Sequence, residues 1–246
     1  MNVVFLGASR GMGRALARLL AMRWDRLFLL GRDGEELERC AADLRARAGR
    51  DDVVVGQGAC DLLDTASFAP ALAAANDALG GIDAVVVTAG VFAVGDALHA
   101  DLALTERMLQ ANFTGTILFC EHARTHLLPR SGQLVVFSSV AGDRGRKPIA
   151  LYGASKAGLS QYLESIDHRF HAEGLRVLTV KPGFVRTGMT AGLPEPPFAG
   201  EPDGVARRVL AAMDAGKPVV YAPAMWALVM WVIRLLPRFV MRRVGF

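Results

Sequence analysis

Residues 2–13 of the chain read NVVFLGASRGMG, and the interpretation of the whole sequence starts from this stretch. The apolar run at 3–6 predicts a buried strand, and residues 14–23 have the apolar spacing of a helix. Between them, Gly7, Gly11 and Gly13 permit a tight turn and close approach of the backbone to a pyrophosphate, which the free N–H groups of a helix start favour. Glycines also occur in strand-to-helix turns that bind nothing. The strand–turn–helix context favours a dinucleotide-phosphate loop.

The rest of the chain repeats this order of strand and helix. Short apolar runs, typical of strands buried on both faces of a parallel sheet, lie at residues 3–6, 27–30, 53–55, 84–88, 134–138, 177–180 and 219–221. Stretches with helical spacing lie at residues 14–23, 35–48, 67–79, 102–127, 153–173 and 202–215. The alternation predicts an α/β fold, a single Rossmann-like, doubly wound parallel sheet of about seven strands with helices on both faces.

Length, composition and charge limit the number of domains and the partners. With 246 residues, 52% of them hydrophobic, we expect one domain at 1–224 and a helical tail of the same domain at 225–246. The tail contains four arginines and no acid, so it carries the whole net charge of +4. Because the remainder is neutral, the basic balance does not indicate nucleic-acid binding.

Cysteine usage and hydropathy predict the compartment. Cys40, Cys60 and Cys120 stand far apart without a C-x-x-C pair, as in proteins of reducing compartments. No run reaches the roughly 18 apolar residues of a membrane span, and the first apolar run is too short for a signal peptide. We therefore expect a cytoplasmic protein.

Gly31-Arg32-Asp33 follows the second predicted strand, where dinucleotide-binding folds distinguish two cofactors. An acid at this strand end typically binds the ribose 2′-hydroxyl of NAD, whereas an arginine suits the 2′-phosphate of NADP. Arg32, together with Arg10 from the glycine loop, favours NADP(H). The alternative is that both arginines are solvated loop residues, and Asp33 is placed to cap the following helix.

Four polar residues suggest a catalytic set. Tyr152 and Lys156 stand four apart on a helical stretch and therefore share one face. Ser139 follows the strand at 134–138, and Asn112 lies within the helix at 102–127. A tyrosine–lysine pair at this spacing is, by itself, more often a packed ring beside a solvated amine.

The combination resembles the short-chain dehydrogenase/reductase family over residues 1 to about 221. The matching motifs are Gly7-x-x-x-Gly11-x-Gly13, Cys60-Asp61-Leu62, Thr88-Ala89-Gly90, Asn112, Ser139, Tyr152-x-x-x-Lys156 and Pro182-Gly183-x-x-x-Thr187. Two positions depart from the family pattern. Leu6 replaces the usual threonine and Thr88 the usual asparagine, which puts the local rigidity of the loop in doubt.

The resemblance implies a role for each member of the set. Tyr152 would exchange a proton with the substrate oxygen, Ser139 would hydrogen-bond that oxygen, and Asn112 would anchor a proton-relaying water. Lys156 would hold the nicotinamide ribose and, with the oxidised nicotinamide, lower the pKa of Tyr152. The residues expected at the cofactor are Gly7, Ser9, Arg10, Gly11, Met12, Gly13, Arg32, Asp61, Leu62, Thr88, Ala89, Gly90, Tyr152, Lys156, Pro182, Gly183, Val185 and Thr187.

The histidines do not predict a metal site. His122 and His126 are four apart on a helix, but no third ligand is evident. We expect no metal, and the family resemblance implies a homodimer or homotetramer.

Two features remain outside these motifs. The loop at 142–147 contains Arg144, Arg146 and Lys147, which either meet an anionic substrate group or are solvated cations steadied by Asp143. The tail combines tryptophans, aliphatic residues and arginines, which suits either peripheral contact with the inner face of a membrane or a helix packed over the protein's own cleft.

Both features resemble the reductases of polyprenyl-phosphate-linked keto sugars, through the loop Asp143-Arg144-Gly145-Arg146 and the tail motif Leu235-Leu236-Pro237-Arg238. An NADP(H)-dependent reductase of a lipid-linked keto sugar is thus one hypothesis. The second is a soluble reductase of acyl, quinone or steroid-like ketones. The third is a non-catalytic NADP(H)-binding sensor or scaffold, which would have no need of the Ser139, Tyr152 and Lys156 set.

Overall fold

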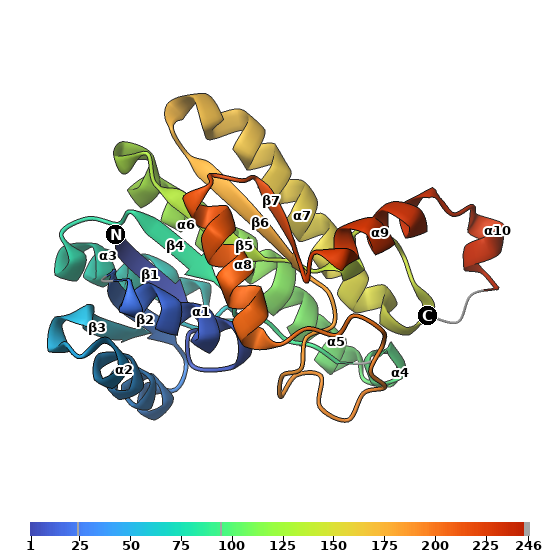
Figure 1. The fold of residues 1–246 in the computed structure, drawn as a ribbon, viewed down its shortest axis with the longest axis horizontal. Helices are drawn as coiled ribbons and strands as arrows, with labels where there is room; N and C mark the ends of the chain where they lie inside the picture. The colour runs from blue at the N-terminus through green and yellow to red at the C-terminus, as the bar shows by residue number, and fades with distance from the viewer. Residues whose placement is uncertain (24, 94, 244–246) are drawn as a thin grey trace.

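The chain is described by a computed structural model, shown in Figure 1, that covers residues 1–23, 25–93 and 95–243. The last three residues of the expected tail, 244–246, lie outside the described part. The seven strands are β1 (Asn2–Leu6), β2 (Arg26–Gly31), β3 (Val54–Ala59), β4 (Ala84–Val87), β5 (Gln133–Phe137), β6 (Arg176–Pro182) and β7 (Val219–Ala222). All neighbours pair in parallel in the order β3-β2-β1-β4-β5-β6-β7, which confirms the predicted fold class.

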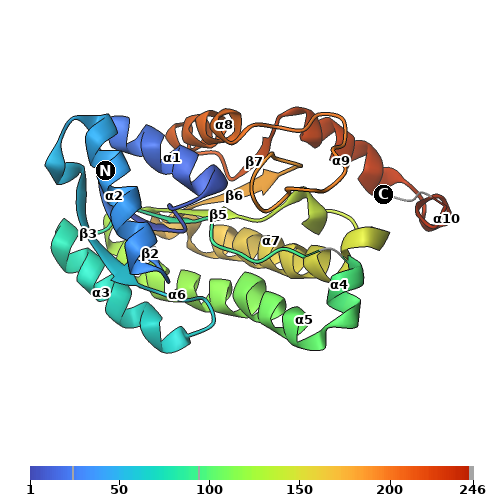
Figure 2. The same cartoon turned by 90° about the horizontal axis from the view of Figure 1, so that it is seen from below.

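Helices cover both faces of this sheet (Figure 2). One face carries α1 (Gly11–Met22), α2 (Gly34–Ala48) and α8 (Pro202–Asp214), and the other carries α3 (Phe68–Leu79), α6 (Thr116–Leu127) and α7 (Ala150–Phe170). Two shorter helices, α4 (Gly95–Ala100) and α5 (Leu102–Leu109), precede α6, and the tail forms α9 (Met225–Leu235) and α10 (Arg238–Met241).

Alternation along the strands divides the core into two. In β1, Val3 and Phe5 pack with the α1 side of the molecule, whereas Val4 and Leu6 pack with the α3 and α6 side. Successive side chains of a strand point to opposite faces, so a strand that is apolar throughout needs a layer on each side. The continuous apolar runs of the sequence are explained by this arrangement.

The largest differences from the predicted boundaries are in β3 and in the helix predicted at 102–127. β3 continues beyond the predicted end, to Ala59. Its glycines suggest a loop in the sequence, but Gly56 is needed within the strand because a side chain there would lie 2.6 Å from the Phe28 ring of β2. The helix predicted at 102–127 is interrupted by a π-helical segment, Gln110–Gly115. A Cβ at Gly115 would lie 1.9 Å from the carbonyl oxygen of Leu62, so the segment passes directly against the chain after β3.

The strand order determines where a ligand can bind. After β1 the chain moves outward through β2 and β3, and then returns to the other side of β1 to form β4. At such a reversal the connections leave in opposite directions and open a crevice beyond the carboxyl ends of the strands.

Candidate active site

A cleft of about 530 Å³ lies beyond the carboxyl ends of β1, β2 and β4. Its volume is within the range usual for ligand pockets. It gathers the predicted cofactor residues Gly7, Ser9, Arg10, Gly11, Met12, Gly13, Arg32, Asp61, Leu62, Thr88, Ala89, Gly90 and Thr187. Residues from five separate motifs therefore meet at the strand-order reversal.

The glycine loop is closed so tightly that it excludes side chains. A Cβ at Gly13 would lie 2.2 Å from the carbonyl oxygen of Gly7, and Gly7 has a φ of +98°. The Thr88 hydroxyl donates a hydrogen bond to the Gly7 carbonyl oxygen at 2.8 Å and so joins the loop to the end of β4. Thr88, which replaces the family's asparagine, thus connects the glycine loop to the end of β4 by a hydrogen bond. Backbone this bare at a helix start fits the pyrophosphate of a dinucleotide.

The end of β2 separates the roles of Arg32 and Asp33. The Asp33 carboxylate accepts hydrogen bonds from the backbone N–H groups of Glu35 and Glu36, both at 3.1 Å, and caps α2. Arg32 is exposed and forms no ion pair with any residue that the structure describes. Arg10 lies 3.6 Å from the Glu36 carboxylate. The acid that would favour NAD is therefore occupied, whereas the Arg32 guanidinium is available.

Tyr152 and Lys156 are brought together on the first turns of α7. The Lys156 Nζ is buried, donates a hydrogen bond to the Phe137 carbonyl oxygen at 2.9 Å, and lies 5.9 Å from the centre of the Tyr152 ring. Ser139 accepts a hydrogen bond from the Ala141 N–H at 3.0 Å, which fixes its hydroxyl at the end of β5. Three of the four predicted catalytic residues thus surround one point.

Burial dominates the electrostatics of this point. It raises the pKa of the Tyr152 phenol to about 12, against the opposing effects of a hydrogen bond with Ser139 and the charge of Arg146. Burial also lowers the pKa of the Lys156 ammonium to about 8. In the chain without cofactor, desolvation of the phenolate therefore outweighs the charge of Arg146. The expected lowering of the Tyr152 pKa includes the charge of a bound oxidised nicotinamide and stays a prediction for the cofactor-bound protein.

Asn112 lies in the π-helical segment and is fully buried. Its side-chain amide donates to the Val91 carbonyl oxygen at 2.6 Å and its Oδ1 accepts from the Val91 N–H at 2.7 Å. The side chain thus holds the segment after β4 in place. Insertions of π-helix often mark functional sites, and here the insertion places Asn112 directly behind the cleft residues Gly90 and Val91.

The predicted residues after β6 separate into two groups. Thr187 lines the cleft, whereas Val185 is buried in the core on the α1 side. Gly183 is covered by the tail, because a Cβ there would lie 2.2 Å from the Trp226 Nε1. The Pro182 carbonyl oxygen lies 3.5 Å from the Ser139 hydroxyl. Pro182, Gly183 and Val185 thus adjoin the site without lining the cleft.

Phe92 is a site residue that the sequence motifs did not identify. It lines the cleft, and its ring packs edge-on against Tyr152 with 4.9 Å between the ring centres. It belongs to no family motif, and its position two residues after Gly90 was the only signal. Phe92 connects the cofactor cleft to the proposed acid.

The basic loop before Tyr152 is largely engaged with the tail. Arg144 donates a hydrogen bond to the Leu236 carbonyl oxygen and Lys147 donates one to the Arg242 carbonyl oxygen, both at 2.6 Å. Carbonyl groups at helix ends attract cations, and these two terminate α9 and α10. Two of the three cations are thus fastened to the tail, a contact that neither sequence-based hypothesis for this loop included.

The tail helix α9 has a buried face and an exposed face. Trp226, Met230 and Ile233 are buried with Val140, and the Trp226 indole donates a hydrogen bond to the Phe198 carbonyl oxygen at 3.1 Å. On the other side, Leu228, Trp231 and Leu235 are 57%, 62% and 66% exposed. Figures 1 and 2 show α9 leaving the body of the molecule with α10 at its end.

Comparison with known proteins agrees with this geometry. The sequence model of the short chain dehydrogenase family matches residues 1–197. The chain belongs to this family. An uncharacterized oxidoreductase of Mycobacterium tuberculosis is 33% identical over 98% of this chain and 96% of its own length. Carbonyl reductase family member 4 of Danio rerio is 31% identical over 87% of this chain and 91% of its own.

Solved structures show the same fold. A short chain dehydrogenase/reductase family protein superposes with a TM-score of 0.77 and 26% identity, covering 89% of this chain and 94% of its own. As a short-chain dehydrogenase, the protein is an oxidoreductase that depends on NAD or NADP, and the family acts on small-molecule carbonyl substrates.

Proposed function

We propose that this short-chain dehydrogenase reduces a carbonyl group with NADPH and that Tyr152 is the proton donor. The observation that carries the proposal is the position of the half-buried Tyr152 phenol, which lies beside Ser139 and against the cleft residue Phe92. A pKa of about 12 keeps the phenol protonated at neutral pH, which is the form that can donate a proton.

The remaining residues position the reactants. NADPH, when bound, supplies the hydride. Ser139 hydrogen-bonds the carbonyl oxygen and stabilises the negative charge that develops there, while Tyr152 transfers its proton to that oxygen. Lys156 has one N–H engaged with the Phe137 carbonyl oxygen and directs its other hydrogens to the ribose hydroxyls. Asn112 holds the backbone of the cleft residue Val91 through two hydrogen bonds. We propose that it also anchors the water that returns a proton to Tyr152.

The test is the oxidation of NADPH with a panel of ketones. Tyr152→Phe keeps the ring and removes the hydroxyl, so turnover should fall by about 10²-fold or more while NADPH still binds. The matched control is Tyr162→Phe, on the same helix as Tyr152. It removes a hydroxyl that donates a hydrogen bond to Glu121 of α6, and it should leave turnover unchanged. Normal turnover by Tyr152→Phe would exclude the assignment. NADPH binding without turnover of any ketone would favour a sensor or scaffold.

NADPH is proposed over NADH because Arg32 forms no ion pair with the residues that the structure describes, whereas Asp33 is engaged as a helix cap. Replacing Arg32 by Asp removes a charge-assisted contact and should weaken NADPH binding by roughly 2 kcal/mol. Titration with NADH is the internal control and should change far less. Equal affinity of the unmodified protein for NADPH and NADH would contradict the proposal.

We further propose that the substrate is a lipid-linked keto sugar, reached while the tail rests on an anionic membrane surface. The exposed apolar face of α9 matches the apolar part of such a surface. The tail's four arginines, with no acidic residue among them, match its negative charge. No helix within the described ranges is long and apolar enough to cross a bilayer, so the contact would be peripheral.

Co-sedimentation with phosphatidylglycerol vesicles tests this part of the proposal. Binding should increase with the anionic lipid content and decrease with salt. The double variant Trp231→Ser/Leu235→Ser should bind less, whereas Leu102→Ser, at an equally exposed apolar position on α5, should bind like the unmodified protein. Absence of binding at low salt would favour a soluble reductase of acyl, quinone or steroid-like ketones.

A further inference from the structure

The loop between Ser139 and Tyr152 uses its charged residues unequally. Arg144 and Lys147 are bound to the tail carbonyl groups. The Asp143 carboxylate is satisfied by Lys181 at 2.6 Å and by the Tyr221 hydroxyl at 2.7 Å, all three side chains being at least partly buried. Arg146 is the remaining charged residue of this loop.

Arg146 has a buried hydrogen-bond donor that is not satisfied by the residues the structure describes. Its Nε is buried and has no hydrogen-bond partner, and its side chain forms no ion pair with any residue that the structure describes. Burial lowers the pKa of its guanidinium, which shows that the charge is poorly solvated. A buried donor without an acceptor costs free energy, so this position is explained most simply if an acceptor arrives with a ligand.

The location of Arg146 indicates which ligand. Arg146 stands directly before the turn Lys147–Ile149, which leads into the first turn of α7, the helix that carries Tyr152. Asp143, whose charge acts on the Arg146 guanidinium, is already neutralised by Lys181. An anion bound by Arg146 would therefore lie on the Tyr152 side of the site, near the carbonyl group that Tyr152 is proposed to protonate.

We infer that Arg146 recognises an oxyanion of the substrate, a carboxylate or a phosphate, placed close to the reacting carbonyl. The inference rests on the proposed role of Tyr152. The planar guanidinium offers donors that match two oxygens of either group at once. Arg146 would thus select keto acids or keto phosphates over neutral ketones of the same size.

The experiment measures anion binding to the NADPH-saturated protein, so that the cofactor's own phosphate sites are filled. The probes are methyl phosphate and acetate, and their binding is measured by calorimetric titration. Arg146→Met should weaken binding of the preferred probe by at least about tenfold, and Arg146→Lys should retain part of it. Arg144→Met is the matched control, because it removes an arginine of the same loop that is bound to the tail, and its anion affinity should be unchanged.

A further arm identifies the source of the oxyanion. Decyl phosphate, used below its micelle concentration, should bind at least tenfold more tightly than methyl phosphate if the substrate is lipid-linked. Equal affinities would indicate a water-soluble anion. Either result supports an oxyanion site at Arg146.

Two outcomes would overturn the inference: no binding of either small anion to the unmodified protein, or an equal loss of binding in Arg146→Met and Arg144→Met. Circular dichroism and thermal unfolding establish that the variants are folded, and Arg146→Lys provides a second test if Arg146→Met is not. Tyr152→Phe should still bind the anion. If it also retained turnover, the proposed acid would be wrong while the anion site remained.

Discussion

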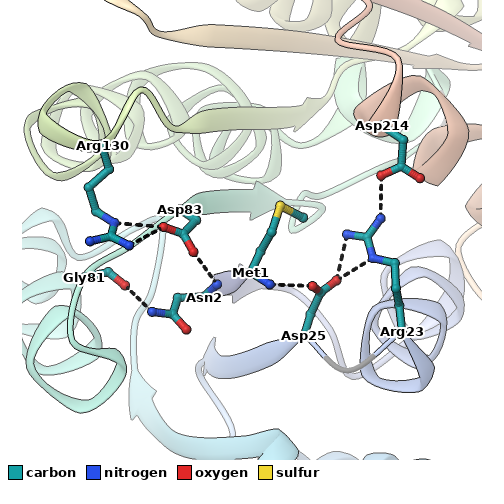
Figure 3. Close-up of polar contacts among 8 residues, drawn as sticks. All are labelled: Met1, Asn2, Arg23, Asp25, Gly81, Asp83, Arg130 and Asp214. Carbon is teal, nitrogen blue, oxygen red and sulfur yellow. Dashed lines mark hydrogen bonds and ion pairs between the residues drawn. The ribbon is translucent and has the colours of Figure 1, made fainter.

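The two ends of the β-sheet differ in how completely their charged side chains are paired. At the amino end, shown in Figure 3, Asp25 binds Arg23 and the Met1 amino group, and Asp83 binds Arg130 and the Asn2 N–H. Arg23 continues to Asp214 at the end of α8. Each charged side chain drawn there has a partner, and the contacts join β1 to the segments before β2 and β4.

At the carboxyl end, three cations are left with unused hydrogen-bonding capacity. Arg32 forms no ion pair within the described ranges, the Arg146 Nε has no partner, and Lys156 is bound to a single backbone carbonyl. The comparison indicates that polar groups at one end stabilise the fold, whereas those at the other are held, at a cost in stability, for a ligand. Substitutions at the two ends should therefore have opposite consequences.

The largest effect is expected from Lys156→Met. Turnover should fall by about 10²-fold or more, because the ammonium that is proposed to hold the ribose beside Tyr152 is removed. The melting temperature should stay the same or rise, since a buried ammonium is replaced by an apolar side chain. Ketone reduction and thermal unfolding measure the two quantities, and Lys217→Met, at an exposed lysine, is the control. A large loss of stability would show that Lys156 also supports the fold.

Asp25→Ala should produce the reverse pattern. Removal of this buried carboxylate leaves Arg23 with the exposed Asp214 as its remaining ion-pair partner among the described residues. The change should cost about 2 kcal/mol, less than for a fully buried pair because Arg23 is partly exposed. Denaturant unfolding measures the loss, while kcat/KM should change less than twofold. Asp214→Ala, which removes the exposed end of the same chain of contacts, should cost under about 1 kcal/mol. A fall in kcat/KM for Asp25→Ala would join the two ends and contradict the comparison.

The smallest effect concerns pH. Because the pKa of Lys156 is about 8 in the folded chain and 10.5 for an ordinary lysine, the unfolded state binds more protons between these values. Stability should therefore rise with pH there, by about 1 kcal/mol between pH 8 and 9. Lys156→Met should lack this rise, and subtracting its unfolding curve from that of the unmodified protein isolates the lysine. Identical pH dependence of both proteins would show that Lys156 is not desolvated.

Much of the fold follows from local patterns, and the exceptions have specific causes. The seven apolar runs became strands because a parallel sheet buries both faces of each strand. The extension of β3 was missed, since Gly56 is required by the Phe28 ring of another strand. The π-helical segment was missed for a similar reason: Gly115 is needed against the Leu62 carbonyl group, a contact that helix periodicity does not contain.

The sequence predicted which residues meet in one cleft where they lie beside a predicted strand end. The glycine loop, Arg32 and Thr187 all line this cleft, and each follows a predicted strand. The tail contacts of Arg144 and Lys147 were not predictable, because their partners are backbone carbonyl groups more than 90 positions away. The raised pKa of Tyr152 in the chain without cofactor was not predictable either, since it depends on packing that the sequence does not display.

The fastening of the loop before Tyr152 also sets an order of events during synthesis. Arg144 and Leu236 are 92 positions apart, and Lys147 and Arg242 are 95 apart. A growing chain that has passed Met189 contains every residue that lines the dinucleotide cleft. It cannot close either contact of the loop until residues 236 and 242 have left the ribosome. The nascent chain therefore contains all the residues that line the cleft well before the loop that precedes Tyr152 can be fastened.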